Sequence, residues 1–243
     1  MAAKGVAPLL ALDTSGKRAF VAVRRADGSI LEKESEGETS HNEELSCGIV
    51  ALLKEATLKA SDLKAIIIGS GPGSFTGLRI GYSVAKGLAY GLRIPIVEHS
   101  SHSAAAMGSG VTEGTIAVLS DARRGEVFFS LYSLAVGTKV GLREIVAPSL
   151  VEGKELLSKI AREVGDKKSL CVVGDSELKG LLPDFPWCLP QALARGLLLC
   201  QNSELFEQFS IDTITLQEPH YVRTVAAKTI AERALQGGKN FPG

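Results

Sequence analysis

The sequence predicts an α/β protein with two tandem domains, each built on a mixed sheet flanked by helices. Strand patterns alternate with helical patterns along the 243 residues. That length is enough for two modest domains with a core each. The halves also begin alike, because residues 10–14 can be laid on residues 118–122 and both runs carry an aspartate after an apolar strand. Such self-similarity indicates two related domains that face each other.

Composition is that of an ordinary globular protein and argues against a chain that binds nucleic acid unaided. Hydrophobic residues make up 45%, charged residues 22%, and the formal net charge is zero. A protein that held RNA by itself would usually be basic, because phosphate contacts dominate such binding. We see no signal-peptide pattern and no apolar run near the ~20 residues that span a bilayer. We therefore expect a cytoplasmic protein whose cysteines, which form no C-x-x-C pair, are reduced.

In the first half, apolar runs predict strands, and apolar residues at intervals of three and four predict helices. The expected elements are strands over 8–13 and 19–24, a hairpin turn at 27–28, a helix that a capping box opens at 40–43, a strand over 65–69, a helix to about 91 and a strand over 93–97.

The second half repeats this arrangement of strands and helices. Its expected elements are strands over 115–120 and 126–132, a helix that Ser149 and Glu152 open and that runs to about 164, a strand over 170–174, and helical patterns over 176–182 and 192–209. An Ala-rich helical pattern follows residue 221.

Each half places an aspartate, Asp13 or Asp121, at the end of its first strand. The two turns could meet across a cleft, where carboxylates can hold a metal–phosphate group or orient water. Thr14 and Ser15 would then contact a phosphate. The other interpretation is that each aspartate only satisfies its own turn. Spacing alone does not decide between them.

Residues 69–81 form a glycine-rich segment between a strand and a helix, where backbone N–H groups can face an anion. The segment lacks the Lys-Ser/Thr of a P-loop. We favour a loop that faces a partner protein over a nucleotide cradle. The alternative is that the glycines only allow a tight turn and close packing.

The helix after this segment has small residues at every fourth position, which suits contact with another helix. The alternative is that this stripe packs against the chain's own sheet. The predicted partner surface consists of His41, Gly71, Gly73, Ser74, Phe75, Thr76, Gly77, Arg79, Gly81, Ala85 and Ala89.

Histidines and arginines give weaker signals. His99 and His102 could share a helix face, but a metal site needs a third ligand, so we expect structural or solvated roles. Arg79 lies in the first turn of its helix, where the helix dipole disfavours a cation. We expect a carboxylate of this chain or of a partner to hold it. Arg123 and Arg124 fall in a predicted turn and are expected to be solvated.

Residues 71–81, Gly-Pro-Gly-Ser-Phe-Thr-Gly-Leu-Arg-Ile-Gly, resemble the signature of the TsaB family, also called YeaZ. The first turn at 12–15, the element 121–128 and the closing motif 219–223 are similar to that family as well. Asn42, Cys47 and the long tail depart from it. TsaB proteins are relatives of actin, the sugar kinases and the TsaD proteins. The resemblance therefore implies two actin-like (ASKHA, ribonuclease-H-like) domains.

The resemblance sets the expected limits and role of the domains. We expect an N-terminal domain over 1–103, a C-terminal domain over 104–223 and a helical tail over 224–243. The implied role is a non-catalytic accessory subunit that binds and activates a TsaD-type enzyme, which transfers threonylcarbamoyl to an adenosine of tRNA. The glycoprotease (M22) label of this superfamily has no support, since the sequence contains no H-E-x-x-H motif.

Partners and cofactors follow from the same resemblance. A TsaE-type ATPase would act through the complex, tRNA would be contacted only indirectly, and the isolated protein would form a homodimer. ATP or ADP could lie at a shared interface, and no metal is expected. The alternatives are a stand-alone phosphotransferase built around Asp13 and Asp121, or a chaperone-like or protease-regulating binding module.

Overall fold

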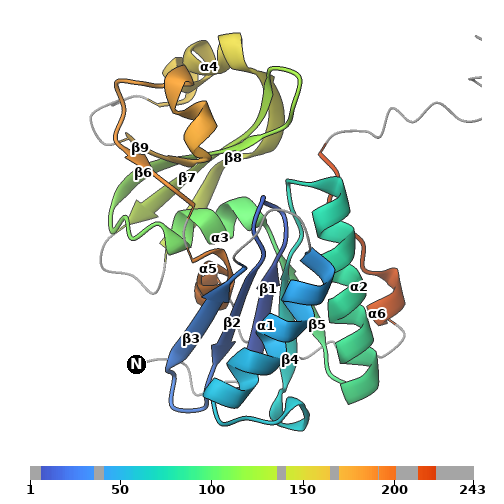
Figure 1. The fold of residues 1–243 in the computed structure, drawn as a ribbon. Coiled ribbons are helices and arrows are strands. Elements are labelled where there is room, and N and C mark those ends of the chain that lie inside the picture. Colours follow the sequence, from blue (N-terminus) through green and yellow to red (C-terminus); the bar gives the residue numbers. More distant parts are fainter. Residues whose placement is uncertain are drawn as a thin grey trace, which may run out of the picture.

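The computed structural model describes residues 7–35, 41–135, 141–164, 170–190, 192–200 and 213–222. Their strands form two five-stranded sheets, one in each half of the chain (Figure 1). The first sheet has the order β3-β2-β1-β4-β5 and contains β1 (Leu9–Asp13), β2 (Phe20–Arg24), β3 (Ile30–Glu34), β4 (Ala65–Gly69) and β5 (Ile96–His99). The second has the order β10-β9-β6-β7-β8 and contains β6 (Gly114–Asp121), β7 (Glu126–Ala135), β8 (Gly141–Glu152), β9 (Leu170–Gly174) and β10 (Trp187–Cys188).

The two sheets share one topology. In each, three strands form an antiparallel meander, and the first strand pairs in parallel with the fourth, which pairs in parallel with the fifth. Asp13 lies opposite Phe20, and Asp121 lies opposite Val127, so each aspartate ends its strand at the same point of the meander. The predicted α/β class with two related mixed sheets is confirmed.

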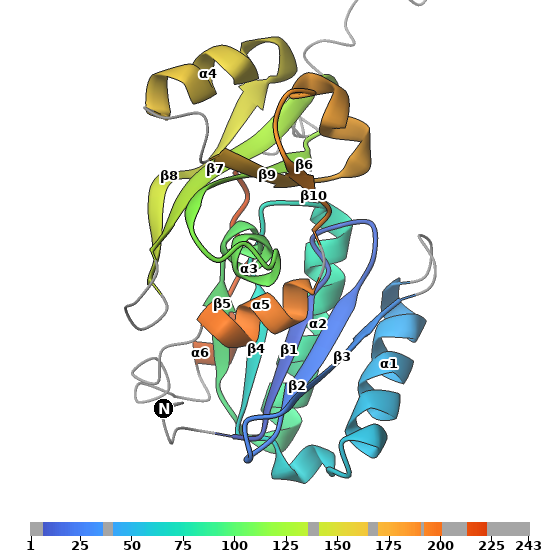
Figure 2. The same ribbon diagram turned by 90° about the vertical axis from the view of Figure 1, so that its left-hand side faces the viewer.

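Helices cover both sheets. On one face of the first sheet lie α1 (His41–Glu55) and α2 (Phe75–Leu92), and their inner side chains join a core with β1 and β4. The other face carries α3 (Ser101–Gly108) and α5 (Leu193–Cys200), and α3 lies between the two sheets (Figure 2). The outer face of the second sheet is covered by α4 (Leu156–Glu163). Shorter helices are η1 (Ala60–Asp62), η2 (Gly153–Glu155), η4 (Ser176–Leu181) and α6 (Thr213–Leu216).

Helix α5 comes from the second half of the sequence but packs on the first sheet. Its Leu193 and Leu197 are buried in one cluster with Leu9 of β1. Gly196 lets α5 approach α3, because an added Cβ would lie 2.0 Å from the Ala104 carbonyl oxygen. The predicted segment 104–223 thus contributes a helix to the first sheet, and α3 crosses the predicted boundary after residue 103. The domain limits stay a prediction, and Arg223 with the tail 224–243 lies outside the described residues.

Some local predictions are wrong. Ser149 and Glu152 do not form a capping box for an α-helix, because both lie in β8 and the Ser149 hydroxyl donates to the Phe129 carbonyl across the sheet. Glu152 precedes only the 3₁₀ helix η2 and makes no side-chain cap there. The helix begins only at Leu156. The strand expected over 93–97 starts at Ile96, because Arg93 adopts a left-handed conformation that ends α2.

Two helical patterns are shorter than expected or lie partly outside the described residues. The pattern over 176–182 forms the 3₁₀ helix η4, and that over 192–209 forms α5, beyond which residues 201–209 are not described. None of the helices in the described ranges has the length and apolar composition needed to cross a bilayer.

Candidate functional site

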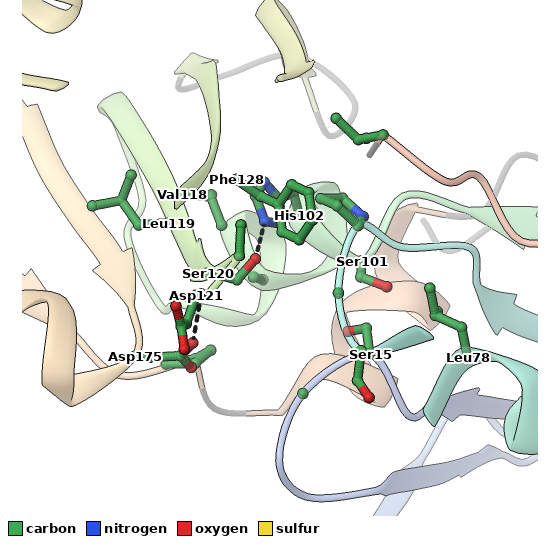
Figure 3. Close-up of a pocket in the computed structure, with 18 of the residues that line it drawn as sticks. Ser15, Leu78, Ser101, His102, Val118, Leu119, Ser120, Asp121, Phe128 and Asp175 are labelled. Carbon is green, nitrogen blue, oxygen red and sulfur yellow. Dashed lines mark hydrogen bonds between the residues drawn. The ribbon is translucent and has the colours of Figure 1, made fainter. Parts of the chain in front are cut away.

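A cavity of about 750 Å³ lies between the two halves of the molecule (Figure 3). Its walls come from the first turn, the glycine-rich segment, α3, the ends of β6 and β9, and the closing segment 219–222. The residues that line it include Ser15, Phe75, His102, Asp121, Asp175 and Tyr221. The cavity is therefore the place where the two halves could share chemistry.

Asp13 lies behind the wall of this cavity rather than in it. Its carboxylate is fully buried, and its Oδ1 accepts hydrogen bonds from the backbone N–H of Ser15 at 2.9 Å and the Ser15 hydroxyl at 2.6 Å. Burial raises the pKa of Asp13. Thr14 is also buried, and its hydroxyl donates to the Gly77 carbonyl at 2.7 Å. Of the predicted nucleotide-binding residues, only Ser15 and Asp121 line the cavity.

Asp121 does face the cavity, beside a second carboxylate that the sequence reasoning missed. Its Oδ1 accepts from the Arg123 N–H at 2.8 Å, and its own N–H donates to Asp175 Oδ2 at 3.1 Å. Burial raises the pKa of Asp175, the hydrogen bond from the Asp121 N–H opposes this effect, and the charge of nearby Glu177 adds to it. The missed signal was an aspartate directly after the strand 170–174, since the ends of the parallel neighbours β6 and β9 meet at one edge of their sheet.

The turn that follows Asp121 holds two arginines in the left-handed region. Arg123 has φ of 65° and Arg124 of 59°, a conformation that costs energy for residues other than glycine. Both line the cavity, and their side chains are exposed. Arg123 also pairs with Asp121, at 3.3 Å between Nη1 and Oδ2. Solvated arginines were expected here, and the exposure agrees with that.

His102 on α3 ties the first half to the second. Its Nδ1 lies 2.7 Å from the Ser130 hydroxyl. Its Nε2 lies 2.9 Å from the Ser120 hydroxyl (Figure 3). Burial lowers the pKa of His102 to about 3, so the ring is neutral at physiological pH. His99 ends strand β5, so the two histidines do not share a helix face as the sequence suggested. Among the described residues, no cluster of three or more possible ligands could hold a metal ion.

The glycine-rich segment packs closely on the first turn. An added Cβ at Gly73 would lie 2.2 Å from the Ser15 carbonyl oxygen, and the Ser74 N–H donates to that oxygen at 2.7 Å. The Ser74 hydroxyl accepts from the Gly77 N–H at 3.1 Å and so caps α2. Close packing therefore explains the glycines. Ser74 and Phe75 still reach the cavity, and Gly71 is buried.

The stripe of small residues on α2 faces inward, which corrects part of the predicted partner surface. Gly77, Gly81, Ala85 and Ala89 are all buried. An added Cβ at Gly81 would lie 2.3 Å from the hydroxyl oxygen of Thr14. The stripe thus brings α2 close to β1 of the same chain, which was the alternative interpretation. The side chain of His41, at the start of α1, lies outside what the structure describes.

Aromatic groups hold Arg79, where a carboxylate was expected. Its guanidinium carbon lies 4.0 Å from the centroid of the Phe75 ring, and its Nε donates to the Tyr221 hydroxyl at 3.3 Å. The two aromatic rings are 5.0 Å apart. A carboxylate partner for Arg79 is not found among the residues described. Cation–π contact and the phenol oxygen stabilise the cation instead.

The outer face of α1 and α2 is open. Val50 on α1 is 67% exposed and Tyr90 on α2 is 65% exposed. An added Cβ at Gly87 or Gly91 would have no atom within 4 Å, so α2 is shallow along this face. The two helices contact each other on the same side of the first sheet (Figure 2). Val50 and Tyr90 are thus large apolar side chains exposed on two neighbouring helices of the first sheet.

Comparison with known proteins places the chain among proteins of tRNA modification. Residues 35–172 match the profile of the family described as "TsaD: tRNA N6-adenosine threonylcarbamoyltransferase". The "tRNA threonylcarbamoyladenosine biosynthesis protein TsaB" of Bacillus subtilis is 36% identical over 64% of this chain and 68% of its own length. The Escherichia coli protein of that name is 33% identical over 51% of this chain and 54% of its own length.

Two solved structures from Pseudomonas aeruginosa are similar throughout most of the fold. One is described as an uncharacterized protein with similarity to peptidase YEAZ. It has a TM-score of 0.73 and 26% identity, and the match covers 89% of this chain and 100% of the other chain. The other, described as YeaZ, has a TM-score of 0.67 and 28% identity over 79% of this chain and 89% of its own.

Proposed function

The chain belongs to the TsaB (YeaZ) family of the actin-like superfamily, and from this premise we propose that it acts in the biosynthesis of threonylcarbamoyladenosine in tRNA. Both the family and the actin-like α/β class are those that the sequence predicts. In this proposal the protein is a non-catalytic subunit that binds and activates a TsaD-type threonylcarbamoyltransferase. The names of the similar proteins support the pathway, and the surface of the first domain supports the role of a binding subunit.

The observation that carries the proposal is the open face of the α1–α2 pair. Val50 and Tyr90 are large apolar side chains that are exposed by 67% and 65%. The shallow surface at Gly87 and Gly91 would let a partner helix approach closely. We therefore place the partner surface on this outer face. Of the residues that the sequence predicted for it, Thr76 and Arg79 remain, because they are exposed at the start of α2. The four buried stripe residues leave the proposed surface.

A stand-alone phosphotransferase is favoured less, because the structure does not bring together the groups that this reaction would use. Asp13 and Thr14 do not line the cavity. Gly174, which ends β9, is closely packed, since an added Cβ there would lie 2.8 Å from the Leu119 carbonyl oxygen. This glycine allows β9 to lie close to Leu119 of β6. No step of a phosphoryl transfer is assigned to this chain.

The other partners belong to the same proposal. A TsaE-type ATPase would join through the complex, and tRNA would be held mainly by the transferase, in keeping with the zero net charge of this chain. In isolation, the open face of α1 and α2 would pair with a second copy. In this scheme ATP or ADP would lie at an interface with the transferase, and Ser15 and Asp121 are the predicted residues that reach the cavity.

A light-scattering titration with the TsaD homologue of the same organism tests the proposal. Wild-type protein should form a defined complex, and Gly87→Arg should weaken it at least tenfold by placing a bulky cation on the shallow face. Gly180→Arg is the matched control, because that glycine also has no atom within 4 Å of an added Cβ but lies in η4. A wild-type chain that ignores the homologue would refute the subunit role. Equal binding by both variants would refute only the chosen face.

A further inference from the structure

Two of the four cysteines meet at the edge of the second sheet. The Sγ atoms of Cys171 on β9 and Cys188 on β10 are 3.7 Å apart. Cys188 lies opposite Val173 in the parallel pairing of these strands. Side chains alternate between the two faces of a sheet along each strand, so Cys171 and Val173 point to the same face. Cys188 points to that face as well, because it lies opposite Val173. Both cysteines are free thiols of intermediate exposure, so small molecules can reach them.

We propose that Cys171 and Cys188 are a redox modification site, which a disulfide of the glutathione class converts reversibly into an intrachain disulfide. A disulfide needs an S–S distance of about 2.05 Å, so the sulfurs must approach by less than about 2 Å. Cys171 lies two positions before the residue opposite Cys188, so the pair is diagonal, and closure combines rotation about the Cα–Cβ bonds with a small shift of the two-residue edge strand β10. The proposal does not depend on the function proposed above.

The chemistry balances as two thiol–disulfide exchanges. The Cys188 thiolate attacks one sulfur of oxidised glutathione, a mixed disulfide forms, and one glutathione leaves. The Cys171 thiolate then attacks the Cys188 sulfur, the protein disulfide forms, and the second glutathione leaves. The protein loses two electrons and two protons, and oxidised glutathione gains them. Burial and the adjacent Cys188 thiol raise the pKa of Cys171 to about 11, so we assign the first attack to Cys188.

The bond would act on the connection between the two halves. Strand β10 contains only Trp187 and Cys188 and lies at the edge of its sheet. Five residues beyond Cys188 the chain reaches Leu193, which lines the cavity and begins α5 on the first sheet. A disulfide would fix this edge strand to β9 and so fix the point from which the connection departs. We expect the oxidised protein to resist proteolysis between residues 185 and 192.

The protein carries its own reporter of this bond. Trp187 is the single tryptophan of the sequence, and its indole N–H donates to the Gly174 carbonyl at 3.1 Å. Because Trp187 is adjacent to Cys188, closing the disulfide should shift its fluorescence intensity or emission maximum. Dithiothreitol should restore the original spectrum.

The test equilibrates the full chain with oxidised glutathione, alkylates the remaining thiols and maps peptides without reduction. We expect two alkylated cysteines instead of four, and one cross-linked peptide pair that contains Cys171 and Cys188. Cys188→Ser should abolish the cross-link and the fluorescence change, whereas Cys200→Ser, which removes a cysteine on α5, should leave both intact.

Three results would overturn the proposal: four alkylated cysteines, stable glutathione adducts without a cross-link, or cross-linking only between chains through the exposed Cys47. The mapping on wild-type protein decides the matter even if Cys188→Ser does not fold. The fluorescence then serves as an independent readout.

Discussion

The turns after β1 and β6 occupy equivalent places in equivalent sheets, but they meet different surroundings. Thr14 is buried beneath α2 and Asp13 lies against the end of β4 and Ser101 of α3, whereas Asp121 is partly exposed and lines the cavity. The cause lies after the fourth strand of each sheet. In the first sheet it leads to the 18-residue helix α2, and in the second to the six-residue helix η4. The long helix closes over Thr14, whereas the turn beside the short helix keeps Asp121 partly exposed.

This difference shows that a repeated topology does not repeat a chemical role. Both turns place a carboxylate after an apolar strand, which in the sequence looked like one device present twice. In the structure, each carboxylate accepts a hydrogen bond from the backbone N–H two residues later, but only the second lines the cavity, where Asp175 lies beside it. The comparison can be tested by variants that act on one turn and spare the other.

The largest effect is expected where α2 closes on the first turn. Gly77→Ala would place a Cβ 2.1 Å from the Thr14 backbone oxygen, so the helix or the turn must move. We expect the free energy of unfolding to fall by about 3 kcal/mol. Gly87→Ala, on the open face of the same helix, should instead gain about 0.5–1 kcal/mol from helix propensity. Urea denaturation measures both, and equal effects would mean that α2 does not pack on this turn.

Exchanging the two aspartates for alanine compares the turns directly. Asp13→Ala leaves the Ser15 N–H and hydroxyl without their acceptor inside the core, which should cost about 2–3 kcal/mol of unfolding free energy. Asp121→Ala should cost less than about 1 kcal/mol, because its Arg123 partner is largely exposed. Thermal and urea unfolding give both values. Similar losses would contradict the assigned difference in burial.

The dependence of stability on pH probes the contact between α3 and the second sheet. Burial lowers the pKa of His102 from its ordinary 6.5 to about 3, so between these values the unfolded chain binds more protons than the native state. Stability is therefore complete above pH 6.5 and falls on acidification, by about 2 kcal/mol at pH 5. His102→Gln should flatten this part of the curve. Parallel curves for the two proteins would exclude a neutral buried imidazole.

The smallest effect is expected at an ion pair that joins the first turn to η4 of the other half. Lys17 and Glu177 form this pair, and their side chains are 40% and 57% exposed. Solvent screens such pairs, so Lys17→Ala should change the free energy of unfolding by less than about 0.5 kcal/mol, and high salt should remove the difference. A double-mutant cycle with Glu177→Gln measures the coupling. A coupling above about 1 kcal/mol would show that this pair holds the halves together.

The sequence was a good guide to features that depend on short-range pattern. Apolar runs located most of the strands, and the aspartates at their ends identified the duplicated turns. The helix α2 was predicted from the spacing of its apolar and small residues. What the pattern left open was orientation, because a stripe of small residues suits the chain's own β1 as well as a partner helix. Only the contact of Gly77 and Gly81 with Thr14 decides between them.

Long-range contacts were beyond such reasoning. Arg79 contacts Tyr221, which lies 142 positions later in the chain, and no rule of local spacing predicts this contact. Asp175 joins Asp121 because β6 and β9 are neighbours, which required the strand order. Ser149 and Glu152 had the composition of a helix cap, but pairing with β7 kept them in β8. In each case tertiary pairing outweighed the local preference of the residues.

The position of α5 has a consequence for how the protein is made. The ribosome releases the first sheet early, but the helix that covers one of its faces begins only at Leu193. Until then part of the apolar surface formed by Leu9, Ala11 and Ile67 would be exposed to solvent, and such surfaces promote aggregation. Contacts between segments so distant in sequence also slow folding. The first half thus completes its core only after nearly the whole chain has been synthesised.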